Sequence, residues 1–504
     1  MKLFGGDHFR KSLRDYVLGR FGQGILALAF TLLTVRVMLP SDYGVYLILL
    51  GLSDFIRPLS SLGVLPTLQQ FLPEMALHAT KDQLFKFSAM MKKIRWSLLI
   101  LLSFLIWACW SWLIDYSGVG TITPYTVYWV MLLVFGVLSL EYSEAMLEAL
   151  LDQKSAQLAR MLHMSIRLAG VIFLAVRHQI SVDNVLISEC LASMIAIILA
   201  EWRLAKSLLK LNPDGTKHFS KNEVLKFAAH LSFTQVMNAF ATPGVLRIFV
   251  SRALGVEAAG QFGFMQTLLQ QINKLMPSLL FSNLVRPMLI AARARNQLEK
   301  VSSACGLLFK INVWLVWPLI PLMLLVGNEL MFMVSSGKLH HMGAEMTFML
   351  LGLSAMTQMQ VAAIVLQIHK MSSQLAWAGL LSLLAPIFVY IGSAYSILYA
   401  CAGLFFASAV RYFITMAIIQ KSAAKVHLDF YGSMRYLAGL ILAFYLVWFA
   451  NISSTLLTVF SFALCLIVLL PLIQPVARFE YEVFKEAFKR NLPFSRYIVN
   501  RWYL

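Results

Sequence analysis

Acidic residues are scarce in this chain. Of 504 residues, 24 are Asp or Glu and 42 are Lys or Arg, and charged residues together make up only 13% of the sequence. Hydrophobic residues make up 59%, whereas soluble domains have roughly 45 to 50%. So apolar a chain with so few charges is not a soluble protein, and we expect an integral membrane protein.

Cysteine pairs and the usual catalytic motifs are also missing. The five cysteines stand singly inside apolar runs: Cys109, Cys190, Cys305, Cys401 and Cys465. This spacing predicts neither a disulfide framework nor a metal site, and the histidines lack metal-ligand spacing. There is no GxxxxGK[ST] phosphate loop for ATP hydrolysis, and no acidic outer loop of the kind expected in a membrane glycosyltransferase. We therefore expect a protein without enzymatic activity or cofactor.

Long apolar segments fill most of the chain. Fourteen can be counted, at about 16–38, 45–72, 96–114, 125–149, 156–177, 184–205, 227–254, 260–286, 304–333, 344–368, 374–396, 398–420, 435–453 and 455–475. Each is about long enough to cross a bilayer as a helix. The break between the eleventh and twelfth, near Tyr399, is the least distinct.

The net charge of +18 is concentrated in alternate connections between these segments. Arg95, just before the third segment, is counted with one set of connections, and the opposite set holds only Arg36, Arg177, Arg252 and Lys338. By the positive-inside rule, both termini are predicted to be cytoplasmic. Because topology accounts for most of the charge, no nucleic-acid partner is needed.

The segments predict an all-α fold with two six-helix lobes and a C-terminal helix pair. The expected parts are a basic cytoplasmic N-terminus 1–15, an N-lobe 16–210, a cytoplasmic linker 211–226, a C-lobe 227–420, the last two spans 421–475 and a cytoplasmic tail 476–504. The basic, amphipathic tail is expected to lie on the anionic membrane surface. Docking of a partner enzyme there is the alternative.

Two hairpins, one in each half, share a pattern. Arg36 precedes Gly44 by the same interval that separates Arg252 from Gly260, and an aromatic residue, Tyr46 or Phe262, follows each glycine two places later. Such internal repeats are common in secondary transporters, in which the substrate site lies between the repeats.

Two cations within the predicted spans have no carboxylate on their own segments. They are Arg247, just after Pro243-Gly244, and Lys274. Buried charges in membrane segments are costly and often functional, so an anion bound in a central cavity is our preferred interpretation, with snorkelling to an interface as the alternative. For Lys310 and Arg411, nearer cytoplasmic ends, we expect snorkelling.

Acidic residues of the fourth segment face basic residues of the fifth if the two form an antiparallel hairpin. Along the hairpin, we expect Glu148 to lie level with Arg160, Glu144 level with about residue 164, and Glu141 level with Arg167. We interpret this set as an interhelical ladder, with a cation or proton site on some of the acids as the alternative. The opposite charges of Asp54 and Arg57, three residues apart, would largely cancel each other.

The first hairpin, with its turn Arg36-Val-Met-Leu-Pro-Ser-Asp-Tyr-Gly44 and a Leu-Pro-Glu ending at Glu74, resembles that of the polysaccharide and O-antigen flippases. These belong to the multidrug/oligosaccharidyl-lipid/polysaccharide exporter superfamily, which includes the MATE (multidrug and toxic compound extrusion) transporters. The resemblance implies an inner-membrane carrier that moves undecaprenyl-diphosphate-linked oligosaccharide, an O-antigen (lipopolysaccharide) or exopolysaccharide unit, to the outer face by alternating access. Polymerases or glycosyltransferases are possible partners.

Candidate site residues follow from what such a substrate requires. A diphosphate needs cations, for which we predict Arg57, Arg247 and Lys274; sugar hydroxyls suit amides, for which we predict Gln235, Asn238, Gln266, Gln270 and Asn273. Interhelical hydrogen bonding is an equally good interpretation of each amide.

Two other functions remain open. A MATE-type drug or cation antiporter would need a carboxylate facing the cavity, and the candidates for ion coupling are Asp54, Glu141 and Glu189. A non-transporting scaffold of a polysaccharide synthesis complex would depend on the cytoplasmic tail.

Overall fold

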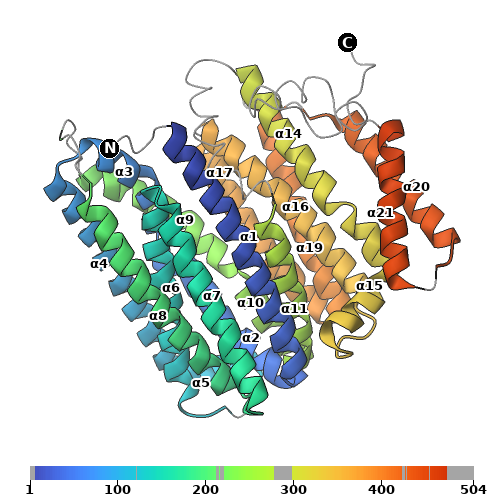
Figure 1. Ribbon diagram of the computed structural model, residues 1–504, viewed down its shortest axis with the longest axis horizontal. Helices are drawn as coiled ribbons and strands as arrows, with labels where there is room; N and C mark the ends of the chain where they lie inside the picture. Colours follow the sequence, from blue (N-terminus) through green and yellow to red (C-terminus); the bar gives the residue numbers. More distant parts are fainter. Residues whose placement is uncertain are drawn as a thin grey trace. The chain divides into compact units, whose positions relative to one another are not determined.

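A computed structural model describes residues 6–120, 122–211, 215, 221–276, 298–369, 371–422, 426, 428–452 and 454–473. These residues form helices and connections and contain no β-strand (Figure 1). The predicted surface helix in the tail 476–504, half of the linker 211–226 and the first five residues lie outside this part of the chain. The all-helical prediction is confirmed for the rest.

The chain divides into two compact units, Met1–Gln271 and Ile272–Leu504. The first unit contains α1 (Gly6–Val37), α2 (Pro40–Ser61), α3 (Val64–His78), α4 (Lys81–Ala108), α5 (Trp110–Ser117), α6 (Thr126–Ala149), α7 (Gln153–Val176), α8 (Val182–Leu209), α9 (Lys221–Phe240), α10 (Pro243–Leu254) and most of α11 (Val256–Lys274). The second contains α14 (Leu298–Val316), α15 (Leu319–Ser335), α16 (Gly343–Ile368), α17 (Ser372–Leu380), the 3-10 turn η1 (Leu381–Leu383), α18 (Leu384–Ser393), α19 (Ile397–Lys421), α20 (Phe430–Phe449) and α21 (Thr455–Ile473).

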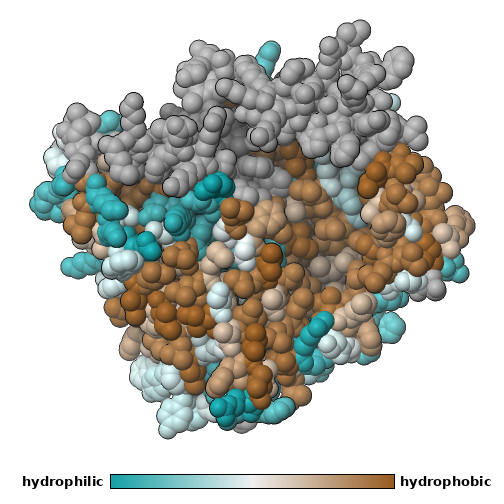
Figure 2. All heavy atoms as spheres, in the orientation of Figure 1, coloured by the Kyte–Doolittle hydropathy of each residue, from teal (hydrophilic) through white to brown (hydrophobic). Residues whose placement is uncertain are grey.

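The helices of the described chain suit a membrane. Nine are long and apolar enough to cross one, or eleven if each of two bent pairs counts as one span. Each of the fourteen predicted segments overlaps a helix or a pair of helices, although 277–286, 453 and 474–475 lie outside the described residues. In Figure 2 apolar residues cover the middle of the visible helices, and hydrophilic residues gather toward their ends. The chain is a multi-pass membrane protein, and the number fourteen stays a prediction.

Several predicted spans are broken where the sequence places a helix-stopping residue. α2 ends at Ser61 and is followed by Leu62 and Gly63, whose φ angles are 32° and 79°, and α3 continues at an angle of 56°. Glycine adopts a positive φ without the steric cost of a side chain. α9 and α10 are separated at Thr242, and Pro243 then occupies the first turn of α10, where its missing N–H costs nothing.

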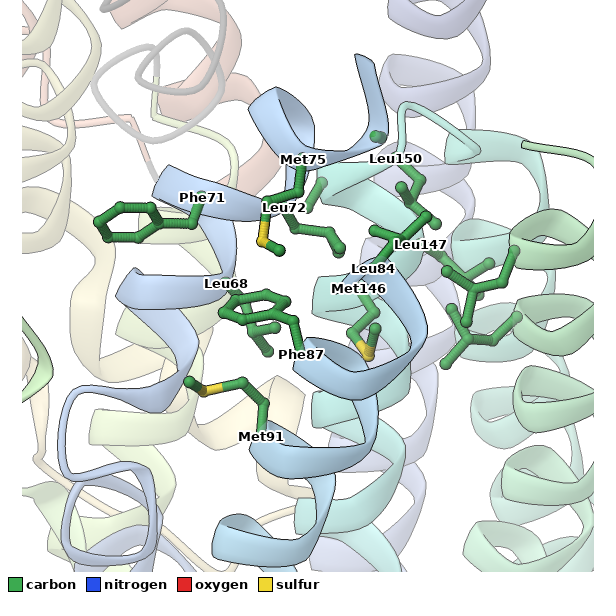
Figure 3. Packing of buried hydrophobic residues seen from close by; sticks show 14 of the residues in the cluster. Leu68, Phe71, Leu72, Met75, Leu84, Phe87, Met91, Met146, Leu147 and Leu150 are labelled. Carbon is green, nitrogen blue, oxygen red and sulfur yellow. The ribbon is translucent and has the colours of Figure 1, made fainter. Parts of the chain in front are cut away.

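The core of the first unit includes a cluster between α3, α4 and α6. Leu68 and Leu72 of α3, Leu84 of α4 and Met146 of α6 point toward one another and are fully buried (Figure 3). α1 lies along α7, and α9 and α10 pack against α2 (Figure 1). Because of this packing, the boundary between the compact units lies within α11 and not in residues 211–226. The division into two six-helix lobes stays a prediction.

α2 approaches α10 and α11 through glycines. A Cβ added to Gly44 would lie 2.2 Å from the carbonyl oxygen of Val256, and one added to Gly51 would lie 2.6 Å from the Cα of Gly244. Small residues permit such close approach of helices in membranes. Segments from the two predicted repeats, the first hairpin and the second, are therefore in backbone contact.

Candidate functional site

Asp54 and Arg57 lie one helical turn apart on α2. Residues three apart face the same side of a helix, and the Arg57 guanidinium donates to Asp54 Oδ1 at 3.0 Å. The Arg57 side chain is 42% exposed. Pro58 follows within the helix, which ends one turn later. Arg57 thus presents a charged group near the bend between α2 and α3.

Two more helices supply charges to this point. Glu141 of α6 places Oε2 3.4 Å from Arg57 Nε and 3.5 Å from Nη2 of Arg95, which comes from α4. Arg95 also donates to the carbonyl oxygens of Arg57 and Leu138, both at 3.4 Å. Its residue is completely buried. The sequence analysis counted Arg95 with a connection, whereas the structure places it within α4, which begins at Lys81, more than three turns earlier.

Arg247 of α10 completes the group. Its residue is only 3% exposed, so it does not point into lipid. Nε donates to Gln266 Oε1 at 3.0 Å, Nη1 donates to the Leu47 carbonyl at 3.2 Å, and Nη1 lies 4.0 Å from Asp54 Oδ2. α10 has no acid of its own, so Asp54 of α2 partly compensates the charge of Arg247. Asp54 lies closer to Arg57, at 3.0 Å, than to Arg247, at 4.0 Å.

We call Asp54, Arg57, Arg95, Glu141 and Arg247 the arginine cluster. It contains three guanidinium groups, which stay protonated in proteins, and two carboxylates. Ionised carboxylates would leave the cluster with one excess positive charge. Because Arg57 is the most exposed member, an anion could reach the cluster at Arg57.

The third acid proposed for ion coupling lies in a different group. Glu189 of α8 accepts hydrogen bonds from Tyr46 of α2 and from Arg167 of α7, and its residue is 2% exposed. The Arg167 guanidinium lies 4.1 Å from the centroid of the Phe30 ring, a cation–π contact. Glu189 is therefore tied to one cation.

The predicted ladder between α6 and α7 forms only in part. Arg160 binds both Glu148 and Glu144 at 2.7 Å, which confirms the first level. Arg167 does not pair with Glu141, because it turns toward α8 and Glu189 while Glu141 turns toward α2 and α4. At the third level the charged residues of the two helices therefore have different partners: Arg167 of α7 contacts α8, and Glu141 of α6 contacts α2 and α4.

The remaining predicted residues are spread over several helices. Gln266 joins the arginine cluster through Arg247, whereas Gln235 and Asn238 lie on α9 and Gln270 on α11, all partly buried. Asn273 accepts a hydrogen bond from Gln360 of α16 at 3.2 Å. Lys274 is the last residue of α11 and is partly buried. The structure thus brings together Arg57, Arg247 and Gln266 of the proposed substrate-binding set.

The second unit holds an ion pair that the sequence interpretation missed. Lys310 of α14, expected to snorkel, is 3% exposed and binds Asp429, which caps the N-terminus of α20. The signal was Asp429 itself, the last acid before an apolar segment. Arg411 is partly buried and donates to the Ala378 carbonyl at 2.9 Å.

Within the described residues, no group of three or more His, Cys, Asp or Glu side chains could hold a metal ion. The five cysteines are all free thiols.

No family model matches the sequence, and no curated protein matches it. Solved structures do resemble this one. The structure titled "Lipid II flippase MurJ, inward closed conformation" matches with a TM-score of 0.70 and 12% identity, covering 94% of this chain and 99% of that one. The chain has the fold of MurJ and the MATE transporters.

Two further structures support this assignment of the fold. An inward-facing MATE transporter of the MOP (multidrug/oligosaccharidyl-lipid/polysaccharide) superfamily matches with a TM-score of 0.59 and 14% identity, over 80% of this chain and 96% of that one. A Pyrococcus furiosus transporter of the same superfamily, described as having a binding pocket of reverse polarity, matches with a TM-score of 0.56 and 12% identity. The match covers 83% of this chain and 97% of that one. The superfamily predicted from the first hairpin thus has the fold seen here. Placement among its polysaccharide flippases stays a prediction.

Proposed function

We propose that the protein is a flippase for a lipid-linked diphosphate, and specifically for undecaprenyl-diphosphate-linked oligosaccharide. The observation that carries the proposal is the excess positive charge of the arginine cluster, which includes residues of α2 in the first hairpin and of α10 in the second. Excess charge inside a membrane protein is costly, and a bound diphosphate would compensate it through charge-assisted hydrogen bonds to guanidinium groups.

Alternating access supplies the transport step in this proposal. The cluster includes residues of both predicted repeats, and α2 contacts α10 and α11 through glycines, so a relative movement of these helices would change access to Arg57. Transporters with internal repeats place their substrate between the repeats and rock around it. The similarity of the fold to a lipid II flippase supports the same substrate class.

The proposal extends to location and partners. By the positive-inside rule, both termini lie in the cytoplasm, and the resemblance to the O-antigen flippases implies that the membrane is the bacterial inner membrane. Glycosyltransferases that build an O-antigen or exopolysaccharide unit would supply the substrate, and a polymerase would consume it. Lys274 and the amides Gln235, Asn238, Gln266, Gln270 and Asn273 are proposed as additional contacts of the diphosphate and the sugars.

The test is transbilayer movement of a labelled undecaprenyl-diphosphate-linked sugar in proteoliposomes. Arg57→Gln and Arg247→Gln are each expected to lower the rate at least about tenfold, the effect of losing roughly 1.4 kcal/mol of interaction. Arg252→Gln is the matched control, because Arg252 lies on the same helix as Arg247 but is exposed. Full rates in both cluster variants would contradict the proposal.

The fold equally suits an antiporter of drugs or cations, the second candidate. Its coupling carboxylate would be Asp54, Glu141 or Glu189, yet each of these lies within 4.0 Å of a guanidinium group. The two functions are separated by Asp54→Asn and Glu141→Gln. Loss of ion-coupled cation uptake in these variants, with no movement of the lipid by the wild type, would favour the antiporter.

A further inference from the structure

Arg95 is the most deeply buried member of the arginine cluster. Its residue is completely buried on α4, whereas the Arg57 side chain is 42% exposed. Nothing in the sequence pattern placed Arg95 in a site. Its role must therefore be exerted through the groups that it touches.

Arg95 contacts the backbone of Arg57 and the side chain of Glu141, the acid that also lies beside the Arg57 side chain. Arg95 Nη1 donates to the carbonyl oxygen of Arg57 itself, and Nη2 lies 3.5 Å from Glu141 Oε2. The same Oε2 atom lies 3.4 Å from Arg57 Nε but accepts no hydrogen bond, and Arg95 Nε donates none. Glu141 Oε2 thus forms long ion pairs with two cations, at 3.4 and 3.5 Å, and a hydrogen bond with neither.

The presence of Arg95 changes the net charge of the arginine cluster. With Arg95 present, one carboxylate is shared by two guanidinium groups, and the cluster of three arginines and two acids keeps one excess positive charge. Without Arg95, Glu141 would neutralise Arg57, and Asp54 would remain for Arg247. The excess would then be zero, and an arriving anion would compete with Glu141 for Arg57.

We infer that Arg95 is a positioning residue that holds Glu141 away from full pairing with Arg57 and thereby sets the preference of the site for a diphosphate over a monophosphate. A diphosphate diester carries more negative charge than a monophosphate diester, and Coulomb energy scales with that charge. A change in the charge of the cluster therefore changes diphosphate binding more than monophosphate binding. This inference rests on the proposed function.

The experiment measures binding of two probes to the purified full-length protein in nanodiscs of zwitterionic lipid. The probes are undecaprenyl-diphosphate-linked and undecaprenyl-monophosphate-linked forms of the same sugar, and the readout is the ratio of their dissociation constants. We expect Arg95→Gln to reduce the preference for the diphosphate roughly tenfold. A merely structural loosening would weaken both probes alike and leave the ratio unchanged.

The double variant Arg95→Gln/Glu141→Gln restores the excess charge and is expected to restore the wild-type ratio within a few-fold. Glu141→Gln alone raises the excess and is expected to increase the ratio. This variant keeps the inference testable if Arg95→Gln does not fold, because an unchanged ratio would contradict it. Lys310→Gln/Asp429→Asn, which removes a buried ion pair of the second unit, is the control and should not change the ratio.

The outcomes separate the inference from the proposed function. A wild-type protein that does not prefer the diphosphate overturns both. A wild-type preference that survives in Arg95→Gln, or that the double variant fails to restore, overturns the role of Arg95 and leaves the flippase proposal intact.

Discussion

Gly51 of α2 and Gly244 of α10 meet backbone to backbone. A Cβ on Gly51 would lie 2.6 Å from the Cα of Gly244, and a Cβ on Gly244 would lie 2.0 Å from the carbonyl oxygen of Gly51. Neither contact leaves room for a side chain. The approach of these two helices, which carry Asp54, Arg57 and Arg247, therefore depends on glycine at both positions.

Gly51→Leu is predicted to separate α2 from α10. The contact is with backbone, which cannot move aside as a side chain can, so we expect a loss of at least about 1–3 kcal/mol in the free energy of unfolding, and a graded loss of transport through Gly51→Ala to Gly51→Leu. Thermal unfolding in detergent and the proteoliposome assay measure the two effects. Gly120→Ala is the control, because nothing lies within 4 Å of that position, and a Gly51→Leu protein as stable and active as Gly120→Ala would refute the close contact.

The ion pair between Lys310 and Asp429 is predicted to attach α20 to α14. Lys310→Met leaves a buried carboxylate without its cation and should cost about 3–5 kcal/mol of unfolding free energy. Asp429→Asn keeps the side-chain oxygen that caps Gly432 N–H, at 2.8 Å in the wild type, so it removes the charge and keeps the cap. In a double-mutant cycle the combined variant should lose less than the sum of the single losses, with a coupling energy of at least about 0.5 kcal/mol. Additive losses would show that the pair contributes nothing.

The group of Tyr46, Glu189 and Arg167 is predicted to be structural in a flippase. Glu189→Gln strands the Arg167 guanidinium, which should destabilise the protein by about 3–5 kcal/mol. Tyr46→Phe removes one hydrogen bond and should cost about 0.5–1.5 kcal/mol. Thermal stability and transport are measured together. Glu189→Gln that keeps its stability but loses dependence on an ion gradient would instead assign ion coupling to Glu189.

The helix pair α6 and α7 shows how far the sequence could predict the charged contacts. The pairing of Glu148 with Arg160 was predictable because it lies near the turn, where few residues separate the partners. Seven residues further along α7, Arg167 faces α8 instead. A side chain advances about 100° around a helix with each residue, so small deviations in helix direction decide which neighbour a distant residue meets.

The approximate positions of the helices and their apolar character were determined by the sequence alone. These features follow from a local cause, the length of each apolar run, whereas the breaks within the predicted spans, such as the one at Leu62 and Gly63, appeared only in the structure. Only the tertiary structure decided which charges share a site. Arg95, Glu141 and Arg247 come from three helices far apart in the chain, and their meeting depends on how those helices rotate and cross, which no short stretch of sequence specifies.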